Sequence, residues 1–201
     1  MTKAPFPAPE GLILALQQGP RKGIPADGYV QAAVLVALIR QDGDYELLLT
    51  RRTDEVETHK GQVAFPGGMR DHTDGTIVDT ALREAEEELG ILPGSVQIAG
   101  LLDDLVTPTG FVITPVVGIL ERIPPLAPSA AEVADVFRAP LSFFADERNG
   151  RSERRNVDGN EYDVWFYDSG GHLIWGVTAA IIRMLLRTIA GFSRPGQTPA
   201  A

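Results

Sequence analysis

The sequence predicts an α/β or α+β fold, in which helices pack on both sides of a mixed β-sheet. Three observations lead to this prediction. Several apolar segments have the length of strands, two longer segments have the pattern of helices, and the helices interrupt the series of strands. The chain has 201 residues, 44% hydrophobic and 22% charged, which suffices for one globular domain with a sizeable core.

The first elements in chain order are two strands. The nearly continuous apolar run VQAAVLVALI at 30–39 has strand length, and YELLLTRR at 45–52 follows it after the turn QDGD. Two such segments joined by a turn of this composition predict a hairpin. The Gly-rich turn FPGG at 65–68 comes next and leads through an acidic loop to a charged helix.

The second half of the chain continues the alternation. VQIAGLLDDL and GFVITPVVGIL, at 96–105 and 110–120, are expected strands separated by the turn VTPTG. EYDVWFYD at 161–168 has alternating aromatic residues and is another expected strand. LIWGVTAAIIRMLLRTIAG at 173–191 predicts a second long helix, whose apolar residues are too dense for an exposed surface.

The two ends of the chain have a different composition from the middle. Residues 1–25 are rich in Pro and Gly around a short apolar turn, Leu12 to Leu16, and are expected to form an N-terminal arm rather than a core element. The tail at 193–201, SRPGQTPAA, is expected to be disordered. The sequence therefore predicts one domain over residues 26–192.

Composition and charge exclude several functions. The net charge of -9 and the pI near 4.8 argue against a general affinity for nucleic acid or for an anionic membrane surface. The chain has no Cys and three His, so any metal site has to be built mainly from oxygen ligands. Neither an 18-residue apolar run nor a convincing cleavage site is present, so we expect a cytoplasmic protein.

The charged segment at 77–89 has clear helix boundaries. Thr76 and Asp79 fit a capping box, Gly90 suits a left-handed C-terminal stop, and Pro93 follows shortly after. One side of this helix carries apolar residues at helical spacing: Val78, Ala81, Leu82, Ala85 and Leu89. That side is expected to pack on the core.

The other side of the helix crowds carboxylates together. At roughly 100° per residue, Glu84, Glu87 and Glu88 fall on one face. Each pair of like charges costs about 0.2–0.5 kcal/mol, which Arg83 offsets only in part. A bound hard cation such as Mg²⁺ or Mn²⁺ would explain this arrangement. A solvated helix face is the alternative for such a run of glutamates.

The helix and the turn before it match a known signature. The pattern G-x5-E-x7-R-E-U-x-E-E-x-G-U, where U is a bulky apolar residue, is matched in its second half by Arg83, Glu84, Ala85, Glu87, Glu88, Gly90 and Ile91. In the first half Gly68 and Asp74 fit if one residue is inserted. The chain thus resembles the Nudix hydrolases. This resemblance implies an α/β/α sandwich with a mixed β-sheet between helices.

An upstream motif points to one branch of that family. The form L-L-T-x-R-[SA]-x3-R-x3-G-x3-F-P-G-G is matched by Leu48, Leu49, Thr50, Arg52, Gly61 and Phe65 to Gly68. This form resembles the coenzyme A pyrophosphatases. The chain departs from it with Thr53 in place of a small residue and Glu57 in place of the second arginine. Replacing that cation by an anion weakens the case for a phosphate-rich ligand.

The resemblance assigns roles to particular residues. Glu84 and Glu88 are the expected metal ligands, with Glu87 as a further ligand, the carbonyl of Gly67 completing the shell and Arg83 orienting the glutamates. Substrate-binding residues are expected to be Arg52, His59, Gly67 and Gly68. The general base is either a helix glutamate or a carboxylate from a distant loop, for which Glu132 is the candidate.

Simpler interpretations accompany several of these residues. Glu132 also suits the exposed start of a short helix capped by Ser129, and the turn with Asp71 and Asp74 suits a solvated loop. Arg51, on the opposite strand face from Arg52, is expected to be exposed, and His59 suits a local hydrogen bond. Two groups of residues also have two interpretations. A basic cluster is either a solvated loop or a phosphate-binding group: Arg151, Arg154 and Arg155. Three aromatic residues are either core residues or a surface on which an adenine stacks: Trp165, Phe166 and Trp175.

The function expected from the resemblance is metal-dependent hydrolysis of the diphosphate in coenzyme A or its derivatives, which releases 3′,5′-ADP and a phosphopantetheine portion. Rival substrates with the same chemistry are ADP-ribose, dinucleotides and nucleoside triphosphates. A catalytically silent binding module is the alternative from a different class, and the retained helix glutamates count against it. The expected partner is a small nucleotide-diphosphate substrate, and a homodimer is the oligomeric state to test, because family members are often dimers.

Overall fold

A mixed β-sheet between helices forms the centre of the computed structural model, which describes residues 6–53, 61–157 and 160–192. Within these residues the main sheet has the order β3-β2-β1-β7-β5, with β4 also paired to β1, β6 to β7 and β8 to β2. Its strands are β1 (Val30–Gln41), β2 (Asp44–Arg52), β3 (Val63–Ala64), β4 (Gly67–Met69), β5 (Gln97–Leu101), β6 (Leu105–Val106), β7 (Phe111–Leu120) and β8 (Val133–Pro140).

The predicted hairpin is confirmed as β1 and β2. These strands pair antiparallel, with Leu38 opposite Leu47 and Gln41 opposite Asp44. The two residues between them, Asp42 and Gly43, have φ angles of 49° and 83°, a geometry that Asp and Gly tolerate best in tight hairpins. β1 also pairs in parallel with β7 along its length, so both strands are buried on two faces and have nearly continuous apolar sequences.

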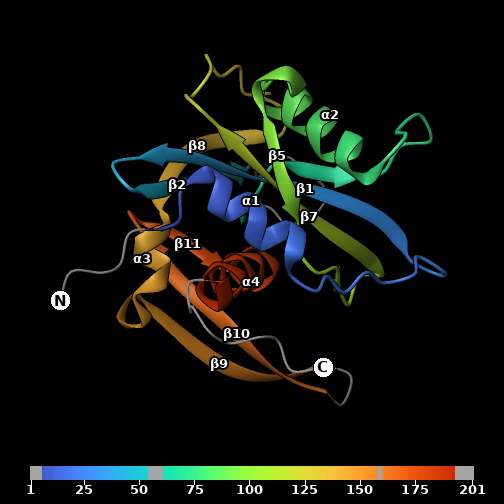
Figure 1. Ribbon diagram of the computed structural model, residues 1–201. Coiled ribbons are helices and arrows are strands. Elements are labelled where there is room, and N and C mark those ends of the chain that lie inside the picture. Colours follow the sequence, from blue (N-terminus) through green and yellow to red (C-terminus); the bar gives the residue numbers. More distant parts are fainter. Residues whose placement is uncertain (1–5, 54–60, 158–159, 193–201) are drawn as a thin grey trace.

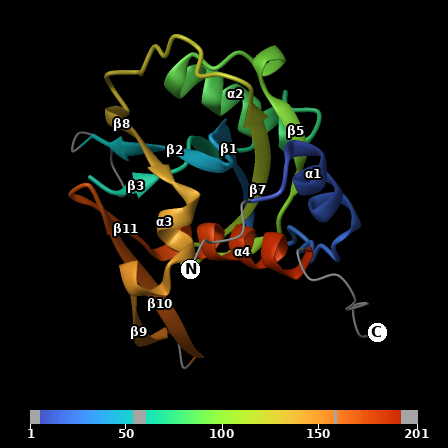
Figure 2. The same ribbon diagram turned by 60° about the vertical axis from the view of Figure 1, so that its left-hand side comes forward.

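Helices cover both faces of this sheet (Figures 1 and 2). On one face α2 (Ile77–Leu89) packs Ala81, Ala85 and Leu89 against apolar residues of β1 and β7. On the other face α1 (Pro9–Gln18) and α4 (Gly176–Phe192) pack on a larger apolar cluster. The α/β/α sandwich expected from the sequence is therefore confirmed.

A smaller sheet extends the α4 side. It consists of β9 (Gly150–Val157), β10 (Asn160–Ser169) and β11 (His172–Trp175), all antiparallel. The short helix α3 (Leu141–Ala145) and the 3-10 turn η2 (Glu147–Asn149) connect β8 to it. A second 3-10 turn, η1 (Pro93–Ser95), lies between α2 and β5.

The N-terminal segment differs from the arm expected for residues 1–25. Pro9–Gln18 forms α1, and its Leu12, Ala15 and Leu16 are buried in the core cluster on the α4 side. The expectation was wrong because the segment is short and flanked by Pro and Gly, so only its packing against β5 and α4 shows that it belongs to the core. The expected tail at 193–201 lies outside the described residues.

Three other boundaries also differ from expectation. The segment 96–105 is not one strand, because Asp103 and Asp104 leave the sheet and accept hydrogen bonds from residues 21–24. The expected helix at 173–191 begins only at Gly176, whose φ is 62°, and the residues before it form β11. The basic segment taken as a loop is strand β9.

Candidate active site

Two adjacent glycines allow a strand to lie tightly between β1 and α2. Gly67 and Gly68 belong to β4 and pair with Val34 and Ala33 of β1. A Cβ at Gly67 would overlap the carbonyl oxygen of Ala33 and lie 2.6 Å from the Cα of Val34. A Cβ at Gly68 would lie 2.6 Å from a carboxylate oxygen of Glu84. The FPGG turn therefore leaves room for the Glu84 side chain.

Arg83 of α2 is the centre of a hydrogen-bond network beside these glycines. Its Nη1 donates to Glu84 and to Glu87, both at 2.9 Å. Its Nε donates to Asp74 at 3.1 Å, and its Nη2 donates to Asp74 at 3.2 Å and to the carbonyl of Met69 at 3.0 Å. Arg83 thus contacts two of the three expected metal ligands and ties them to the loop before α2.

Asp74 is buried and holds Arg83 in place. It also accepts a hydrogen bond from the N–H of Asp71 at 2.9 Å. The hydrogen bonds from Arg83 are the main reason that the pKa of Asp74 is lowered to about 2. The carboxylate of Asp71, in contrast, is exposed and contacts its own turn, where Oδ1 accepts hydrogen bonds from Thr73 and lies 2.8 Å from Nδ1 of His72. The solvated interpretation suits Asp71, whereas Asp74 takes a structural part in the site.

The three glutamates of α2 lie in different surroundings. The side chain of Glu88 is 5% exposed, that of Glu84 15% and that of Glu87 59%. Burial is the main cause that raises the pKa of Glu88 to about 8, against the opposing effects of Arg52 and of a hydrogen bond from the N–H of Gly67. Burial also raises the pKa of Glu84. The acidic face therefore extends from solvent at Glu87 to the interior at Glu88.

Arg52 lies at the end of β2 on the same side of the sheet as Glu88. Its Nη1 is 4.0 Å from Oε1 of Glu88, and its buried Nε has no hydrogen-bond partner among the residues that the structure describes. A buried donor without a partner is uncommon in folded proteins. Arg52 therefore keeps hydrogen-bonding capacity for an anionic ligand. Its neighbour Arg51 is half-buried rather than exposed as expected.

Glu132 reaches the site through strand pairing. It lies in an exposed turn before β8, and β8 pairs with β2 so that Val133 is opposite Arg52. The negative charge of Glu132 raises the pKa of both Glu84 and Glu88, which places its carboxylate within electrostatic reach of them. The alternative of a helix start is wrong, because the residues after this turn form a strand.

Two positions singled out in the sequence belong to the segment between β2 and β3. His59, expected to bind substrate, and Glu57, the departure from the upstream motif, lie outside the described residues. The structure therefore brings together eight of the expected site residues, and they come from β2, β4, α2 and the turn before β8: Arg52, Gly67, Gly68, Arg83, Glu84, Glu87, Glu88 and Glu132.

A divalent cation fits the chemistry of this group. Within residues 6–53, 61–157 and 160–192, no three Asp, Glu or His side chains are arranged as a closed set of metal ligands. Glu84 and Glu87 are instead both turned toward Arg83. Yet Glu84, Glu88 and Glu132 repel one another electrostatically, and their oxygens are the donors that Mg²⁺ and Mn²⁺ prefer.

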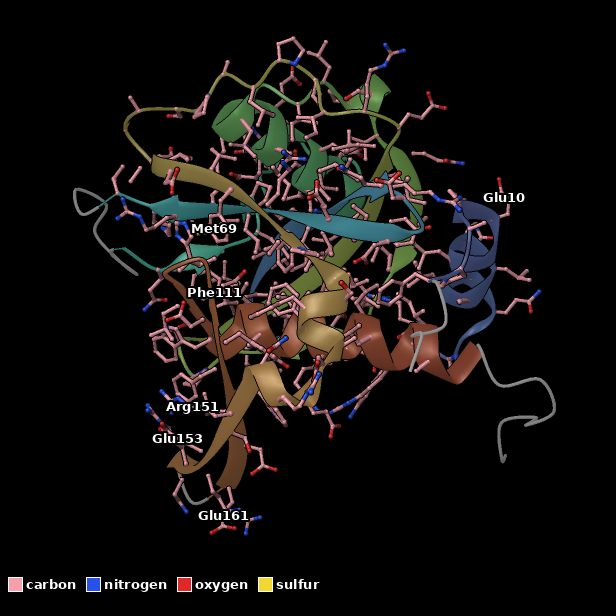
Figure 3. The ribbon with its side chains drawn as sticks, turned by 90° about the vertical axis from the view of Figure 1, so that its left-hand side faces the viewer. Glu10, Met69, Phe111, Arg151, Glu153 and Glu161 are labelled. Atoms are coloured by element: carbon pink, nitrogen blue, oxygen red, sulfur yellow. The ribbon has the colours of Figure 1, made fainter. Side chains whose placement is uncertain are left out.

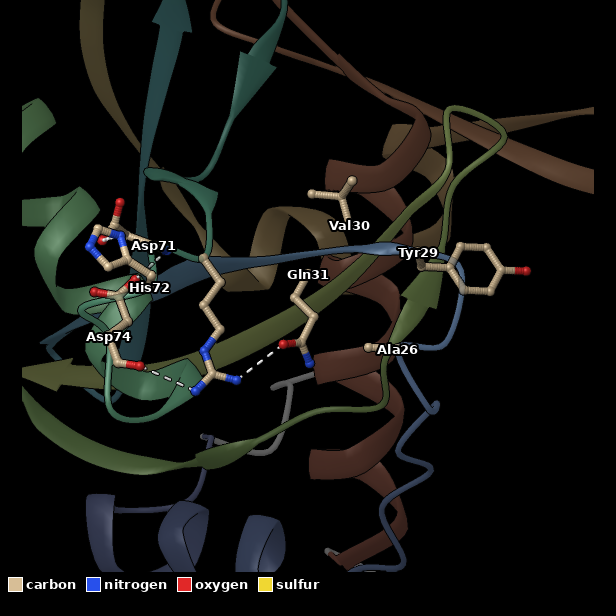
Figure 4. Close-up of a pocket in the computed structure, with 8 residues that line it drawn as sticks. Ala26, Tyr29, Val30, Gln31, Asp71, His72 and Asp74 are labelled. Atoms are coloured by element: carbon tan, nitrogen blue, oxygen red, sulfur yellow. Dashed lines mark hydrogen bonds and ion pairs between the residues drawn. The ribbon is translucent and has the colours of Figure 1, made fainter.

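Among the residues that the structure describes, two open hollows lie near the N-terminal end of α2. One, of about 450 Å³, is lined by Tyr29 and the loop from Arg70 to Asp74, and the other, of about 540 Å³, by residues around Arg21 and Thr76. At the first hollow Arg70 donates to Oε1 of Gln31 at 3.0 Å and to the carbonyl of Asp74 at 3.2 Å. Figure 4 shows Gln31 and Asp74 on the lining of this hollow. Neither hollow is lined by Glu84 or Glu88, so neither is the acidic site.

The arginines of the basic cluster form ion pairs with nearby acidic side chains. Arg151 and Arg155 both pair with Glu153, and Arg154 lies 3.8 Å from Glu161 and 3.7 Å from Asp163. Figure 3 shows Arg151, Glu153 and Glu161 along the β9–β10 hairpin, which projects away from Met69 on the main sheet. The cluster is therefore mostly compensated.

The three aromatic residues belong to the smaller sheet and its contacts. Phe166 is buried between Trp175, stacked at 5.9 Å, and Arg151, whose guanidinium lies 4.4 Å from the ring centre. Trp165 is stacked under the guanidinium of Arg183 at 3.4 Å. This packing agrees with the interpretation of these residues as part of the core and its surroundings.

Fold and site together define an α/β/α sandwich whose acidic helix packs on a Gly-Gly strand. The model of the NUDIX domain matches residues 29–166. An uncharacterized Nudix hydrolase NudL from Cronobacter sakazakii is 44% identical over 157 residues, which cover 77% of this chain and 80% of that protein. A NudL protein from Photorhabdus laumondii is 42% identical and covers 82% of this chain and 87% of its own length.

Solved structures agree with these relatives. The crystal structure of a NUDIX hydrolase from Alicyclobacillus acidocaldarius has a TM-score of 0.54 at 19% identity, covering 85% of this chain and 98% of that one. This likeness supports the fold. The chain belongs to the Nudix family, and it is a hydrolase of phosphoric anhydrides. None of the described helices is both long and apolar enough to span a membrane.

Proposed function

We propose that this Nudix hydrolase cleaves the diphosphate of coenzyme A or its derivatives with the help of Mg²⁺ or Mn²⁺. One observation carries the catalytic part of the proposal: the buried Glu88 lies with Glu84 beside the Gly67–Gly68 strand, and Nη1 of Arg52 lies 4.0 Å from the carboxylate of Glu88. The choice of coenzyme A rests on the upstream motif from Leu48 to Gly68.

Different residues would bind the anionic diphosphate and the divalent cation. A diphosphate repels an incoming nucleophile because its oxygens are negatively charged, and a divalent cation, when bound, neutralises that charge. Glu84 and Glu88 would hold the cation, with Glu87 and the carbonyl of Gly67 as further ligands. Arg83 keeps Glu84 and Glu87 in place through its Nη1. Arg52 would donate to a phosphate oxygen from its Nε, which no other described residue engages in a hydrogen bond.

Hydrolysis then requires one proton acceptor. A water molecule forms a new oxygen–phosphorus bond, the bridging phosphorus–oxygen bond breaks, and the two phosphate products leave as anions. The proton of the water passes to a carboxylate within reach, and we assign this role to Glu132. A helix glutamate would be less suited, because Glu84 and Glu88 are needed for the cation.

The rival substrates have an observation in their favour. A 3′-phosphate distinguishes coenzyme A from ADP-ribose and from most dinucleotides, and it calls for a free cation on the enzyme. The arginines of the β9–β10 hairpin already pair with Glu153, Glu161 and Asp163. ADP-ribose or a dinucleotide is therefore the second candidate substrate.

The experiment is a substrate panel. Coenzyme A, acyl-coenzyme A, ADP-ribose, NADH and dNTPs are incubated with the protein and Mg²⁺ or Mn²⁺, beside Glu88→Gln and the matched control Glu86→Gln, whose residue is exposed on the same helix. We expect fastest hydrolysis of coenzyme A, lost in Glu88→Gln and kept in Glu86→Gln. Faster hydrolysis of another nucleotide would discard the substrate but keep the mechanism. Binding without turnover would support a silent module.

A further inference from the structure

Two hydrogen bonds join the residue after β2 to the turn that carries Glu132. The backbone N–H of Thr53 donates to the carbonyl of Glu132 at 3.0 Å, and its Oγ1 donates to the carbonyl of Ala131 at 3.0 Å. The sequence marked Thr53 only as a departure from the upstream motif. The structure shows that its hydroxyl contacts a segment 78 residues further along the chain.

The other end of this turn is held by α2. We call residues 127–132 the Glu132 loop. The N–H of Ala127 donates to the carbonyl of Leu89 at 2.8 Å, and the N–H of Ser129 donates to that of Glu88 at 2.9 Å. Carbonyls in the last turn of a helix have no partner within the helix, so the loop satisfies them. The backbone of Glu88 thus holds the loop while its side chain faces the site.

The strand pairing is irregular at the same point. β2 and β8 shift register between Arg51 and Arg52, directly before Thr53. Such bulges change the direction of the side chains that follow them. Without further contacts the turn at 131–132 would be a short exposed connection, and exposed connections are the mobile parts of a fold. Thr53 supplies these contacts on the β2 side.

From these contacts we propose that Thr53 is a positioning residue, which fixes the Glu132 loop so that the Glu132 carboxylate is held beside Glu84 and Glu88. This inference rests on the proposed role of Glu132 as the proton acceptor. A base works only at hydrogen-bond distance from the water that it deprotonates. Loss of the Oγ1 bond frees the carbonyl of Ala131 and lets Glu132 move, while the backbone bond from Thr53 remains.

The first test compares three variants with coenzyme A and Mg²⁺, or with ADP-ribose if the panel shows that it is the substrate. Thr53→Val keeps the shape and the N–H but removes the hydroxyl, and we expect kcat to fall about tenfold with KM nearly unchanged. Thr53→Ser restores the donor and is expected to retain most of the activity. Thr188→Val is the matched control, because Oγ1 of Thr188 donates to a carbonyl within α4, outside the site.

A double-mutant cycle separates positioning from general destabilisation. If Thr53 acts through Glu132, Thr53→Val combined with Glu132→Gln is no slower than Glu132→Gln alone. Additive losses, or equal losses in Thr53→Val and Thr53→Ser, would overturn the inference, and thermal melting of each variant shows whether it is folded. If Glu132→Gln is slow but Thr53→Val is not, only the inference fails. Full activity of Glu132→Gln would overturn both the assignment of the base and the inference.

Discussion

Glu87 and Glu88 are adjacent in sequence, yet their side chains are 59% and 5% exposed. The sequence places both on the acidic face, and only the packing of β2 and β4 shows how differently they are surrounded. A carboxylate held in a buried site loses less freedom when it binds a cation. The burial therefore predicts that Glu88 is the more important of these two proposed ligands.

We expect Glu88→Gln to lower kcat by about 100-fold or more, because a lost metal ligand removes several kcal/mol of transition-state stabilisation. Glu87→Gln should cost about tenfold or less. Steady-state rates at saturating Mg²⁺ measure both. Equal losses of kcat in the two variants would mean that the exposed fraction of a glutamate side chain does not predict its importance for activity.

Asp74 gives a prediction about pH. Its pKa is about 2 in the folded protein and 3.8 in the unfolded chain, so the unfolded chain binds more protons between these values. The stability that Asp74 contributes is therefore fully present above about pH 4 and is lost as the pH falls toward 2. Asp74→Asn should lower the free energy of unfolding by about 2 kcal/mol at pH 7.

Urea denaturation at a series of pH values measures this difference. The difference should shrink as the pH falls toward 2, where Asp74 is half protonated in the folded protein, and should disappear below that pH, where Asp74 is protonated in both states. Asp163→Asn is the control, because its side chain is 61% exposed and lies 3.7 Å from Arg154, and surface ion pairs contribute little. A constant difference at all pH values would contradict the role of the Asp74 charge.

At the scale of elements, the two glycines of β4 are expected to have different roles, Gly67 in stability and Gly68 in activity. Gly67→Ala places a methyl group against the backbone of β1, which cannot move easily, and we expect a loss of about 1–3 kcal/mol in unfolding free energy. Gly68→Ala meets only the flexible carboxylate of Glu84. It should change stability less and lower kcat about tenfold, because Glu84 is displaced.

Urea denaturation and kcat, measured for both variants, distinguish the two effects. The reverse pattern, with Gly68→Ala less stable and Gly67→Ala less active, would contradict the assignment of the two glycines.

The elements could be predicted from the sequence where the signals are local. Helix α2 was predicted with its observed limits because Thr76 and Asp79 form the capping box and Gly90 adopts a φ of 72°. The hairpin of β1 and β2 followed in the same way from its turn. β11 was missed because its apolar residues continue directly into α4, and only pairing with β10 shows that they form a strand.

The site could be predicted only in part, for a related reason. The α2 glutamates and Gly68 follow from a contiguous motif, and Arg52 from one nearby. The contacts that connect Thr53 to Ala131, and Ser129 to Glu88, join residues far apart in the chain. No local pattern encodes such pairs, so the position of Glu132 could be proposed but not argued from the sequence.

At the scale of the whole molecule, α1 completes the sandwich. Its Leu12 is fully buried in the core, while Leu14 on the same helix is 43% exposed. Leu12→Ala should therefore lower the unfolding free energy by about 2–5 kcal/mol, and Leu14→Ala by about 0.5 kcal/mol or less. Thermal and urea denaturation of both variants provide the measurement. Equal stability of the two would show that α1 does not hold the core together.

The attachment of the Glu132 loop to the end of α2 also has a consequence for how this enzyme can vary. Residues 121–126 connect β7 to Ala127, whose N–H donates a hydrogen bond to the carbonyl of Leu89. Extra residues inserted before Ala127 would lengthen the connection without changing where Glu132 lies. This connection is thus a place where natural or engineered insertions could add contacts to new substrates while the catalytic geometry stays the same.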